Sequence, residues 1–344
     1  MQETGTKAMP FREWMRQALF DPDTGYYTTN VRTVGRRGDF STSATAGTLL
    51  GEAVAAWLRN QMHHHPHVQA VIEVGGGNGA LSATVRQALG WWRRRRVQWH
   101  MVETSPVLRA QQQEKLGRSA AVWHESMAAA MEASGGRAFI FHNELVDAFP
   151  VTLLQWDEAG QVWREVWVRR VGAEWREELG ELPVNGTASG GWTGHALRDK
   201  QRVEVHDSYR EWLNEWAPAW REGAMLTVDY GDEFPAVYHR QPKGTLRAYF
   251  AQQRLTGMEL YQRMGKQDLT ADVNFTDLQA WGGSLGWDTE TFESQGDFIR
   301  RHVKAAGERA RRSAADSFVL EQEGAGGAFK ALVQSPGGVV GSRL

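Results

Sequence analysis

The chain of 344 residues contains no cysteine. Disulfide bonds, thiolate zinc sites and a cysteine nucleophile are therefore excluded. The 39 basic and 41 acidic side chains nearly cancel, so the chain lacks the overall positive charge of a general nucleic-acid or anionic-membrane binder. No apolar run approaches the ~20 residues that cross a bilayer. The first residues also lack the charged-then-apolar order of a secretory signal, and these features together favour a cytoplasmic protein.

Strands and helices alternate between residues 68 and 144, a pattern typical of a parallel sheet with right-handed crossovers. Strands are expected at "VQAVIEV", "VQWHMVE", "AAVWH" and "AFIFHNE", with helices at 80–89 and 106–116 between them. The strand "AMLTVDYG" resumes the sheet, and helices at 276–285 and 298–314 precede a last strand, "AFKALVQ". The expected fold class is α/β, a doubly wound sheet.

The remaining segments suggest three regions. Residues 1–66 hold two helices, at 11–19 and 49–62. Residues 151–201 begin with "VTLLQWDEAGQVWREVWVRRV", whose alternation around a turn predicts an antiparallel hairpin. We therefore expect a core formed by 67–150 and 202–344, with 151–201 inserted as a β subdomain.

The glycine-rich stretch "EVGGGNGA" joins the first sheet strand to its helix. Gly75, Gly77 and Gly79 allow positive φ angles and a close approach of a ligand to the backbone. The turn fits both a relaxed dinucleotide fingerprint and the E-x-G-x-G-x-G form typical of S-adenosylmethionine (SAM) enzymes. Glu73 favours SAM, because a carboxylate there repels a pyrophosphate but suits an amino group and a sulfonium.

Further candidates follow the next two strands. Glu103 ends the second strand, where an acid accepts hydrogen bonds from ribose hydroxyls in either class of enzyme. We expect Thr104 and Ser105 beside it to contribute to the same site. The segment "WHESM", with Ser126 and Met127, closes the third strand and is expected to flank the adenine.

The segment "HNELVDAFP" follows the fourth strand, and strand carboxyl ends face the ligand crevice of such a sheet. Asn143 is therefore expected beside the cofactor, with Glu144 and Asp147 as the catalytic acids. Their spacing suits one face of a helical turn. The alternative is that Asp147 caps a helix and Glu144 is a surface acid.

Seven blocks of this sequence resemble those of the MidA-like SAM-dependent methyltransferases, the family of the mitochondrial complex I assembly factor that dimethylates a protein arginine. The resemblance covers roughly residues 11–333, and the blocks are "GRRGDFSTS", "EVGGGNGALS", "MVETSPVLRAQQQEKL", "NELVDAFP", "VDYG", "GTLRAY" and "QDLTADVNFTDL". The resemblance implies a class I methyltransferase fold (Rossmann-like), with an N-terminal helical extension and an inserted antiparallel β subdomain on the substrate side. It also implies SAM as cofactor, S-adenosylhomocysteine as product and no metal. In "GDFSTS", Gly38, Thr42 and Ser43 would fold over the cofactor.

Four positions depart from the family pattern. Gly76 stands for a proline, Thr45 for an acid and Asp272 for a histidine, and a histidine is missing near Gln252. Apart from Gly76, these positions lie on the acceptor side. A protein arginine, another protein side chain and a small metabolite therefore stay open as acceptors.

Two other classes of protein are compatible with parts of this sequence. They are an NAD(P)-dependent oxidoreductase and a non-catalytic assembly protein. The runs "HHHPH" and "WWRRRR" are interpreted as solvated connections far from the glycine turn. As partners we expect a protein or small-molecule methyl acceptor, but no nucleic acid and no membrane, and a homodimer stays open.

Overall fold

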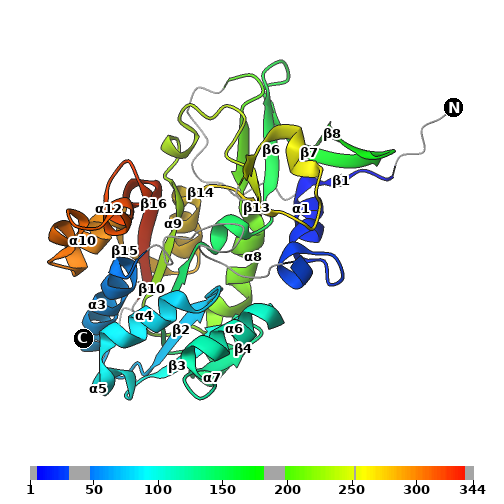
Figure 1. The fold of residues 1–344 in the computed structure, drawn as a ribbon. Coiled ribbons are helices and arrows are strands. Elements are labelled where there is room, and N and C mark those ends of the chain that lie inside the picture. The colour runs from blue at the N-terminus through cyan, green and yellow to red at the C-terminus, as the bar shows by residue number, and fades with distance from the viewer. Residues whose placement is uncertain (1–5, 31–46, 182–197, 252, 338–344) are drawn as a thin grey trace, which may run out of the picture. The chain divides into compact units, whose positions relative to one another are not determined.

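The computed structural model describes residues 6–30, 47–181, 198–251 and 253–337 (Figure 1). The chain forms two compact units, each assembled from separate stretches. Unit 1 consists of Met1–Arg32, Val146–Glu211 and Gly231–Asp277, and unit 2 of Thr33–Leu145, Trp212–Tyr230 and Leu278–Leu344. These boundaries differ from the three regions expected from the sequence. The first helix and the inserted β segment share one unit, because a strand before that helix pairs with the insertion, Met9 opposite Val168.

Unit 2 is built on a sheet with the strand order β15-β16-β10-β5-β2-β3-β4. The five strands from β10 to β4 run parallel, as expected, whereas β16 is antiparallel to both of its neighbours. All five residues of β2 are buried, which is typical of a central parallel strand covered on both faces. The strands are β2 (Ala70–Val74), β3 (Gln98–Val102), β4 (Val122–His124), β5 (Ala138–Asn143), β10 (Met225–Asp232), β15 (Trp287–Ser294) and β16 (Phe329–Pro336).

Helices of unit 2 pack their apolar faces on this sheet. Figure 1 shows α3 and α4 side by side, and their buried residues join those of β2, β5 and β10 in one core. Helix α4 has the predicted bounds, as does α6, which starts after Ser105 accepts the backbone N–H of Leu108 at 3.5 Å. The helices are α3 (Leu49–His64), α4 (Ala80–Leu89), α5 (Trp91–Arg94), α6 (Pro106–Leu116), α7 (Met127–Ala133), α10 (Gln295–His302), α11 (Ala306–Ala310), α12 (Ala314–Leu320) and α13 (Ala325–Ala328).

The prediction of a single helix at 298–314 is wrong. Helix α10 begins earlier, because the Ser294 side chain accepts the N–H of Asp297 at 3.1 Å. It ends at His302, where Val303 is extended, and α11 follows as a separate short helix. The break places Arg309 of α11 within 2.7 Å of Glu52 on α3, an ion pair that local periodicity does not reveal.

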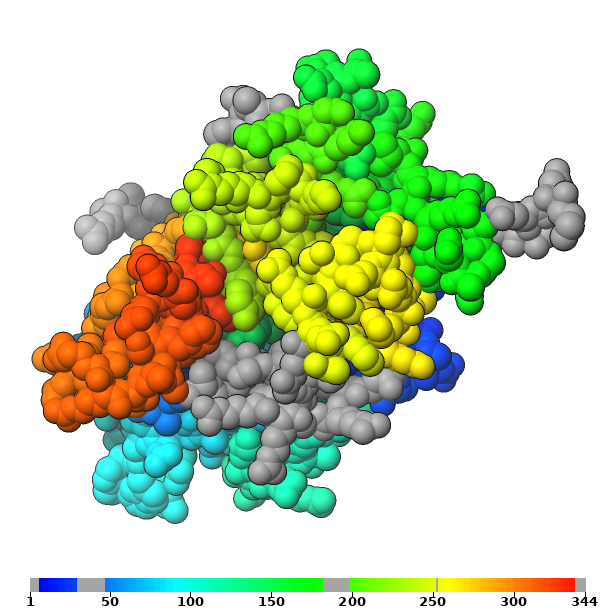
Figure 2. Space-filling view, turned by 45° about the horizontal axis from the view of Figure 1, so that its top comes forward, coloured from blue at the N-terminus to red at the C-terminus, as the bar shows by residue number. Residues whose placement is uncertain are grey.

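Unit 1 contains two small sheets. In the first, β1-β7-β6-β9, with β8 paired to β7, all neighbours are antiparallel, and the β6–β7 hairpin confirms the predicted one. The second has the order β12-β11-β13, and β11, β12 and η5 contribute to the yellow surface in Figure 2. The elements are β1 (Met9–Pro10), α1 (Phe11–Phe20), η1 (Tyr26–Asn30), η2 (Val146–Ala148), β6 (Thr152–Asp157), β7 (Val162–Val171), β8 (Glu174–Gly180), β9 (Arg202–Val205), η4 (Ala236–Tyr238), β11 (Arg247–Phe250), β12 (Gln253–Leu255), η5 (Gly257–Tyr261), β13 (Asp268–Thr270) and β14 (Val273–Asn274).

Two helices continue from one unit into the other along the chain. They are α8 (Asp207–Trp216), which is followed by η3 (Ala217–Ala219), and α9 (Phe275–Ser284). Among the residues described, no helix is both long enough and apolar enough to cross a membrane.

Candidate active site

The glycine turn after β2 has the backbone that its sequence predicts. Gly75, Gly77 and Gly79 have φ angles of 62°, 51° and 79°, in the left-handed region that side chains with a Cβ rarely adopt. The N–H of Gly75 donates to the carbonyl of Val102 at 3.0 Å, so the turn is tied to the end of β3. Alternating left-handed residues of this kind direct backbone N–H groups into a concavity, which suits a polar ligand.

Glu73 lies beneath this turn. Its side chain is buried and accepts a short hydrogen bond from the hydroxyl of Ser82 on α4. The pKa of Glu73 is raised to about 7, chiefly by burial and also by the charge of Glu103, while the hydrogen bond from Ser82 acts to lower it. A Cβ on Gly76 would lie 3.0 Å from the Glu73 carboxyl carbon, so glycine at 76, in place of the family's proline, leaves room for the acid.

Glu103 lies directly after β3 and is buried. One carboxylate oxygen accepts the N–H of Ser105 and the other accepts the amide of Gln112, both at 2.9 Å. Burial raises the pKa of Glu103, and these hydrogen bonds, with one from the Thr104 backbone, lower it. A carboxylate has about four acceptor sites, so one further hydroxyl donor is compatible with this arrangement.

Gln112 is a site residue that the sequence reasoning missed. Its side-chain amide donates to Glu103 and to the Gly77 carbonyl, at 2.9 Å each, and its oxygen accepts the indole N–H of Trp123 at 3.0 Å. It is fully buried and links three segments at the end of the sheet. The available signal was a polar residue four positions after Leu108, on the buried side of α6.

The strand register aligns the ends of four parallel strands. Val74 lies opposite both Val102 and His142, and Val102 lies opposite His124. The segments that follow these residues are therefore at one edge of the sheet. Their expected site residues are Gly75, Glu103, Ser126 and Glu144. Ser126 accepts the N–H of Ala129 at 3.2 Å as the cap of α7, and Met127 is buried.

The turn after β5 is held in an uncommon conformation. Glu144 has a φ of 53°, which is costly for a residue with a Cβ and is found where surrounding contacts enforce it. Its N–H donates to the carbonyl of Val228 at 3.0 Å, and the Asn143 amide donates to its carboxylate at 3.0 Å. The next N–H, of Leu145, donates to the fully buried carboxylate of Asp229 at 3.1 Å. Asp229 is thus a second site residue that the sequence pattern does not assign, although it lies in "VDYG", one of the blocks that resemble the family.

Asp147 belongs to unit 1 and lies in the 3₁₀ turn η2. Its carbonyl accepts the N–H of Ala271 at 3.1 Å, and its charge, with that of Asp268, contributes to a raised pKa of Tyr27, for which burial is the main cause. Glu144 precedes η2 and is left-handed, so the expected sharing of one helical face is wrong.

Several expected residues lie outside the described part of the chain: Gly38, Thr42, Ser43, Thr45 and Gln252. Asp272 is described and forms a short ion pair with Arg247 in unit 1. Among the described residues, no group of three or more histidines and acids is arranged to hold a metal ion.

These features of unit 2 fit an adenosine cofactor. A glycine turn with no Cβ to block approach stands beside a buried carboxylate with an unused acceptor site, and Gln112 fixes the two relative to each other.

A solved structure with the same fold is a Burkholderia thailandensis protein bound to S-adenosyl-homocysteine. It matches with a TM-score of 0.78 at 22% identity, over 95% of this chain and 88% of its own. This likeness confirms the expected Rossmann-like methyltransferase fold.

Two curated relatives are named protein arginine methyltransferase NDUFAF7 homolog, mitochondrial. The Drosophila melanogaster protein is 26% identical over 310 residues, 78% of this chain and 65% of its own length. The Caenorhabditis elegans protein is 26% identical over 295 residues, 76% of this chain and 66% of its own. The match therefore spans just under two thirds of each relative. Both relatives are named as mitochondrial proteins, and this finding overturns the cytoplasmic location expected from the sequence.

Residues 49–293 match the protein family described as "Putative S-adenosyl-L-methionine-dependent methyltransferase". The match covers most of the chain and decides against the NAD(P)-dependent oxidoreductase that the glycine turn alone left open. The chain belongs to this family.

Proposed function

We propose that this methyltransferase modifies a guanidinium nitrogen of an arginine side chain in a protein, with Glu144 as the residue that binds and orients the acceptor. The names of the curated relatives support this acceptor. The observation that carries the proposal is the constrained carboxylate of Glu144 at the end of β5, on the same sheet edge as the cofactor residues.

The chemistry explains why a carboxylate is needed there. SAM supplies an electrophilic methyl carbon on a positively charged sulfur. An arginine side chain is also positive, because its pKa exceeds 12. Glu144 offsets that repulsion, aligns one nitrogen with the methyl carbon and accepts a proton during or after transfer.

The backbone contacts around Glu144 fix the position of this turn. Hydrogen bonds to Val228 and Asp229 fasten the turn to β10. On the other side, a Cβ on Gly75 would lie only 2.7 Å from the Leu145 side chain, so the turn packs directly against the glycine turn. Asp229 is therefore proposed as a positioning residue, since it acts on the Glu144–Leu145 backbone rather than on a substrate.

For Asp147 the role of supporting acid stays a proposal. In unit 1 its carbonyl and its charge act on Ala271 and Tyr27. A purely structural role would make Asp147→Asn lower stability without a specific loss of turnover.

The test is methyl transfer from radiolabelled SAM to protein extracts, with methylarginine detected by mass spectrometry. Glu144→Gln should keep S-adenosylhomocysteine affinity but lose turnover by about two orders of magnitude, the scale of general acid–base catalysis. Glu132→Gln is the matched control, because Glu132 is exposed and lies towards the end of helix α7, outside the segments assigned to the cofactor. Wild-type turnover in Glu144→Gln, or label found only in small molecules, contradicts the proposal. An absence of any transfer favours the non-catalytic assembly protein.

A further inference from the structure

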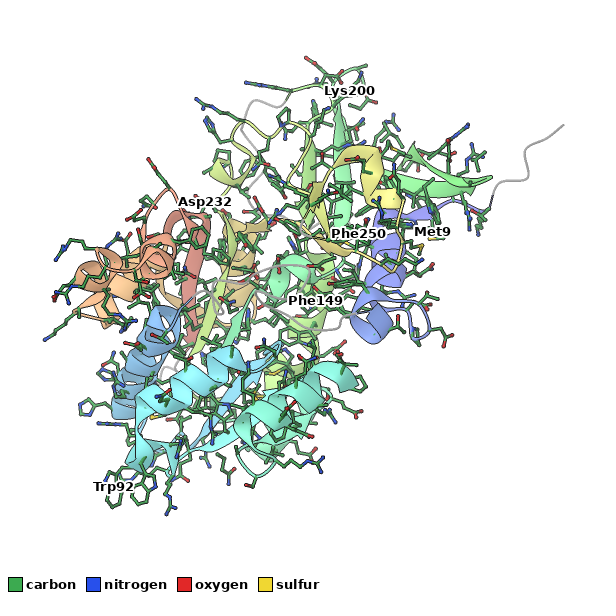
Figure 3. All side chains as sticks on the ribbon, in the orientation of Figure 1. Met9, Trp92, Phe149, Lys200, Asp232 and Phe250 are labelled. Atoms are coloured by element: carbon green, nitrogen blue, oxygen red, sulfur yellow. The ribbon has the colours of Figure 1, made fainter. Side chains whose placement is uncertain are left out.

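Two tryptophans in unit 2 differ from every other tryptophan that the structure describes. Trp91 and Trp92, on α5, are 48% and 75% exposed, whereas the others described are buried or half-buried. In Figure 3 the labelled Trp92 projects outward from the end of α5. Two adjacent exposed indoles form a contiguous apolar surface, and such surface rimmed by polar residues is a mark of interaction sites.

Four arginines follow these tryptophans directly: Arg93, Arg94, Arg95 and Arg96, all exposed. No acidic residue occurs in the sequence between Glu73 and Glu103. Among the described residues, none of the four arginines forms an ion pair with an acid. The basic character extends further, because the positive charges of Arg93 and Arg94 add to burial in lowering the pKa values of Arg59 and Arg86.

Capping of helix α4 does not account for this cluster. Arg59 of α3 already donates to the Ala88 carbonyl in the last turn of α4, at 3.0 Å. Arg86 donates to the Ala120 carbonyl at 2.6 Å. The four arginines of residues 93–96 are therefore not required at these carbonyls, and the interpretation of the run as a solvated helix end is incomplete.

The ring geometry distinguishes two kinds of anionic partner. The Trp91 and Trp92 rings meet edge to face, with centroids 4.5 Å apart and planes at 82°. The Arg95 guanidinium lies 4.3 Å from the Trp91 ring centre and covers that ring. Single-stranded nucleic acid needs ring faces on which successive bases stack, and two rings at 82° to each other do not present aligned faces to successive bases. Indoles at the level of lipid headgroups, with arginines beside the phosphates, have no such requirement.

We propose that residues 91–96 form a docking surface for an anionic phospholipid bilayer. Arginines bind the headgroup phosphates, and Trp92 enters the headgroup region. Helix α4 separates this surface from the glycine turn by its full ten residues, about 15 Å. The surface and the cofactor residues therefore lie at opposite ends of the sheet of unit 2, and a docked bilayer leaves the cofactor edge accessible.

Cosedimentation of the full chain with vesicles tests this proposal. Binding is expected with phosphatidylcholine vesicles that contain phosphatidylserine, but not with phosphatidylcholine alone, and it should weaken as salt is added. Each arginine near an anionic surface strengthens binding about fivefold, so Arg94→Gln with Arg96→Gln should weaken it about 25-fold. Trp92→Ser should also weaken binding. All variants should retain wild-type affinity for S-adenosylhomocysteine, which shows that they are folded.

The matched control is Phe318→Ser with Arg311→Gln, which removes an exposed aromatic ring and an exposed arginine elsewhere on unit 2. It should bind vesicles as the wild type does. The proposal is overturned if the wild type does not pellet with anionic vesicles, or if the changes in residues 91–96 leave pelleting unaltered. Tighter binding of an oligouridine than of vesicles, lost in the same variants, would assign the surface to nucleic acid instead.

Discussion

Glu73 and Glu103 illustrate how two buried acids beside one turn acquire different environments. Glu103 accepts two amide donors, from Ser105 and Gln112, whereas Glu73 accepts the hydroxyl of Ser82 and lies near the charge of Glu103. The sequence predicted that both acids belong to the site. It did not predict that Glu73 points beneath the turn, because that depends on Ser82, a polar residue on the buried side of α4.

The raised pKa of Glu73 predicts a pH dependence of stability. The folded carboxyl has a pKa of about 7, against a model value of 4.5. Between these values the folded state holds a proton that the unfolded state has lost, so the free energy of unfolding falls as pH rises, by up to about 3 kcal/mol. Glu73→Gln should remove this part of the slope and raise stability at pH values above the folded pKa.

Urea unfolding of wild type and Glu73→Gln across this range is the measurement. Glu204 has a similarly raised pKa of about 7 from burial, so the wild-type slope contains its contribution as well. Because Glu204 is present in both proteins, the difference between the two curves isolates Glu73. If the free energies of unfolding of the two proteins change with pH in parallel, Glu73 is ionised in the folded protein at neutral pH.

At the scale of elements, local patterns predicted most of unit 2 and little of unit 1. The bounds of α4 and α6 follow from residues at their ends, such as Gly79 and Ser105. Strand β15 has no apolar run and one buried residue, so it is defined by its pairing with β16 rather than by its own sequence. The short strands β11 to β13 likewise depend on contacts between distant segments.

One such contact is the ion pair between Arg247 of β11 and Asp272, where the family has a histidine. The Arg247 side chain is 6% exposed, and Asp272 also donates its backbone N–H to the Thr245 hydroxyl at 2.9 Å. Asp272→Asn leaves a buried guanidinium without its counter-charge and should lower the free energy of unfolding by about 3–5 kcal/mol. Urea unfolding measures the loss.

The control for this change is Arg169→Gln, which breaks the exposed Arg169–Glu178 pair between β7 and β8 and should cost less than about 1 kcal/mol. A double change, Arg247→Met with Asp272→Leu, should recover much of the lost stability, because apolar residues can replace a buried pair. If Asp272→Asn unfolds like the wild type, the pair does not support the β11–β13 sheet.

At the scale of the whole molecule, the sequence predicts structure formed by consecutive segments better than structure formed by distant ones. The doubly wound sheet arises from consecutive strand–helix–strand steps, each of which has a local signature. The two units are instead defined by long-range pairings, of β1 with β7 in unit 1 and of β16 with β10 in unit 2. Neither pairing has a periodicity that a single sequence reveals. The cofactor candidates that are described all fall in unit 2, whereas Asp147 and Asp272 fall in unit 1.

This division predicts which residues become protected from hydrogen exchange when the cofactor binds. S-adenosylhomocysteine at about 100 times its Kd should stabilise the bound state by about 2.7 kcal/mol, and amide hydrogen exchange should slow at residues 75–82, 103–112 and 143–145. Exchange in β6, β7 and β8 of unit 1 should not change.

Glu103→Ala should weaken binding by about 1.5–3 kcal/mol, the scale of hydrogen bonds to a charged group, and reduce the protection at the same ligand concentration. Glu132→Ala should leave the protection intact, because Glu132 is exposed towards the end of α7 and outside the assigned site. Protection confined to β6–β8, or equal in wild type and Glu103→Ala, would remove Glu103 and the glycine turn from the cofactor site.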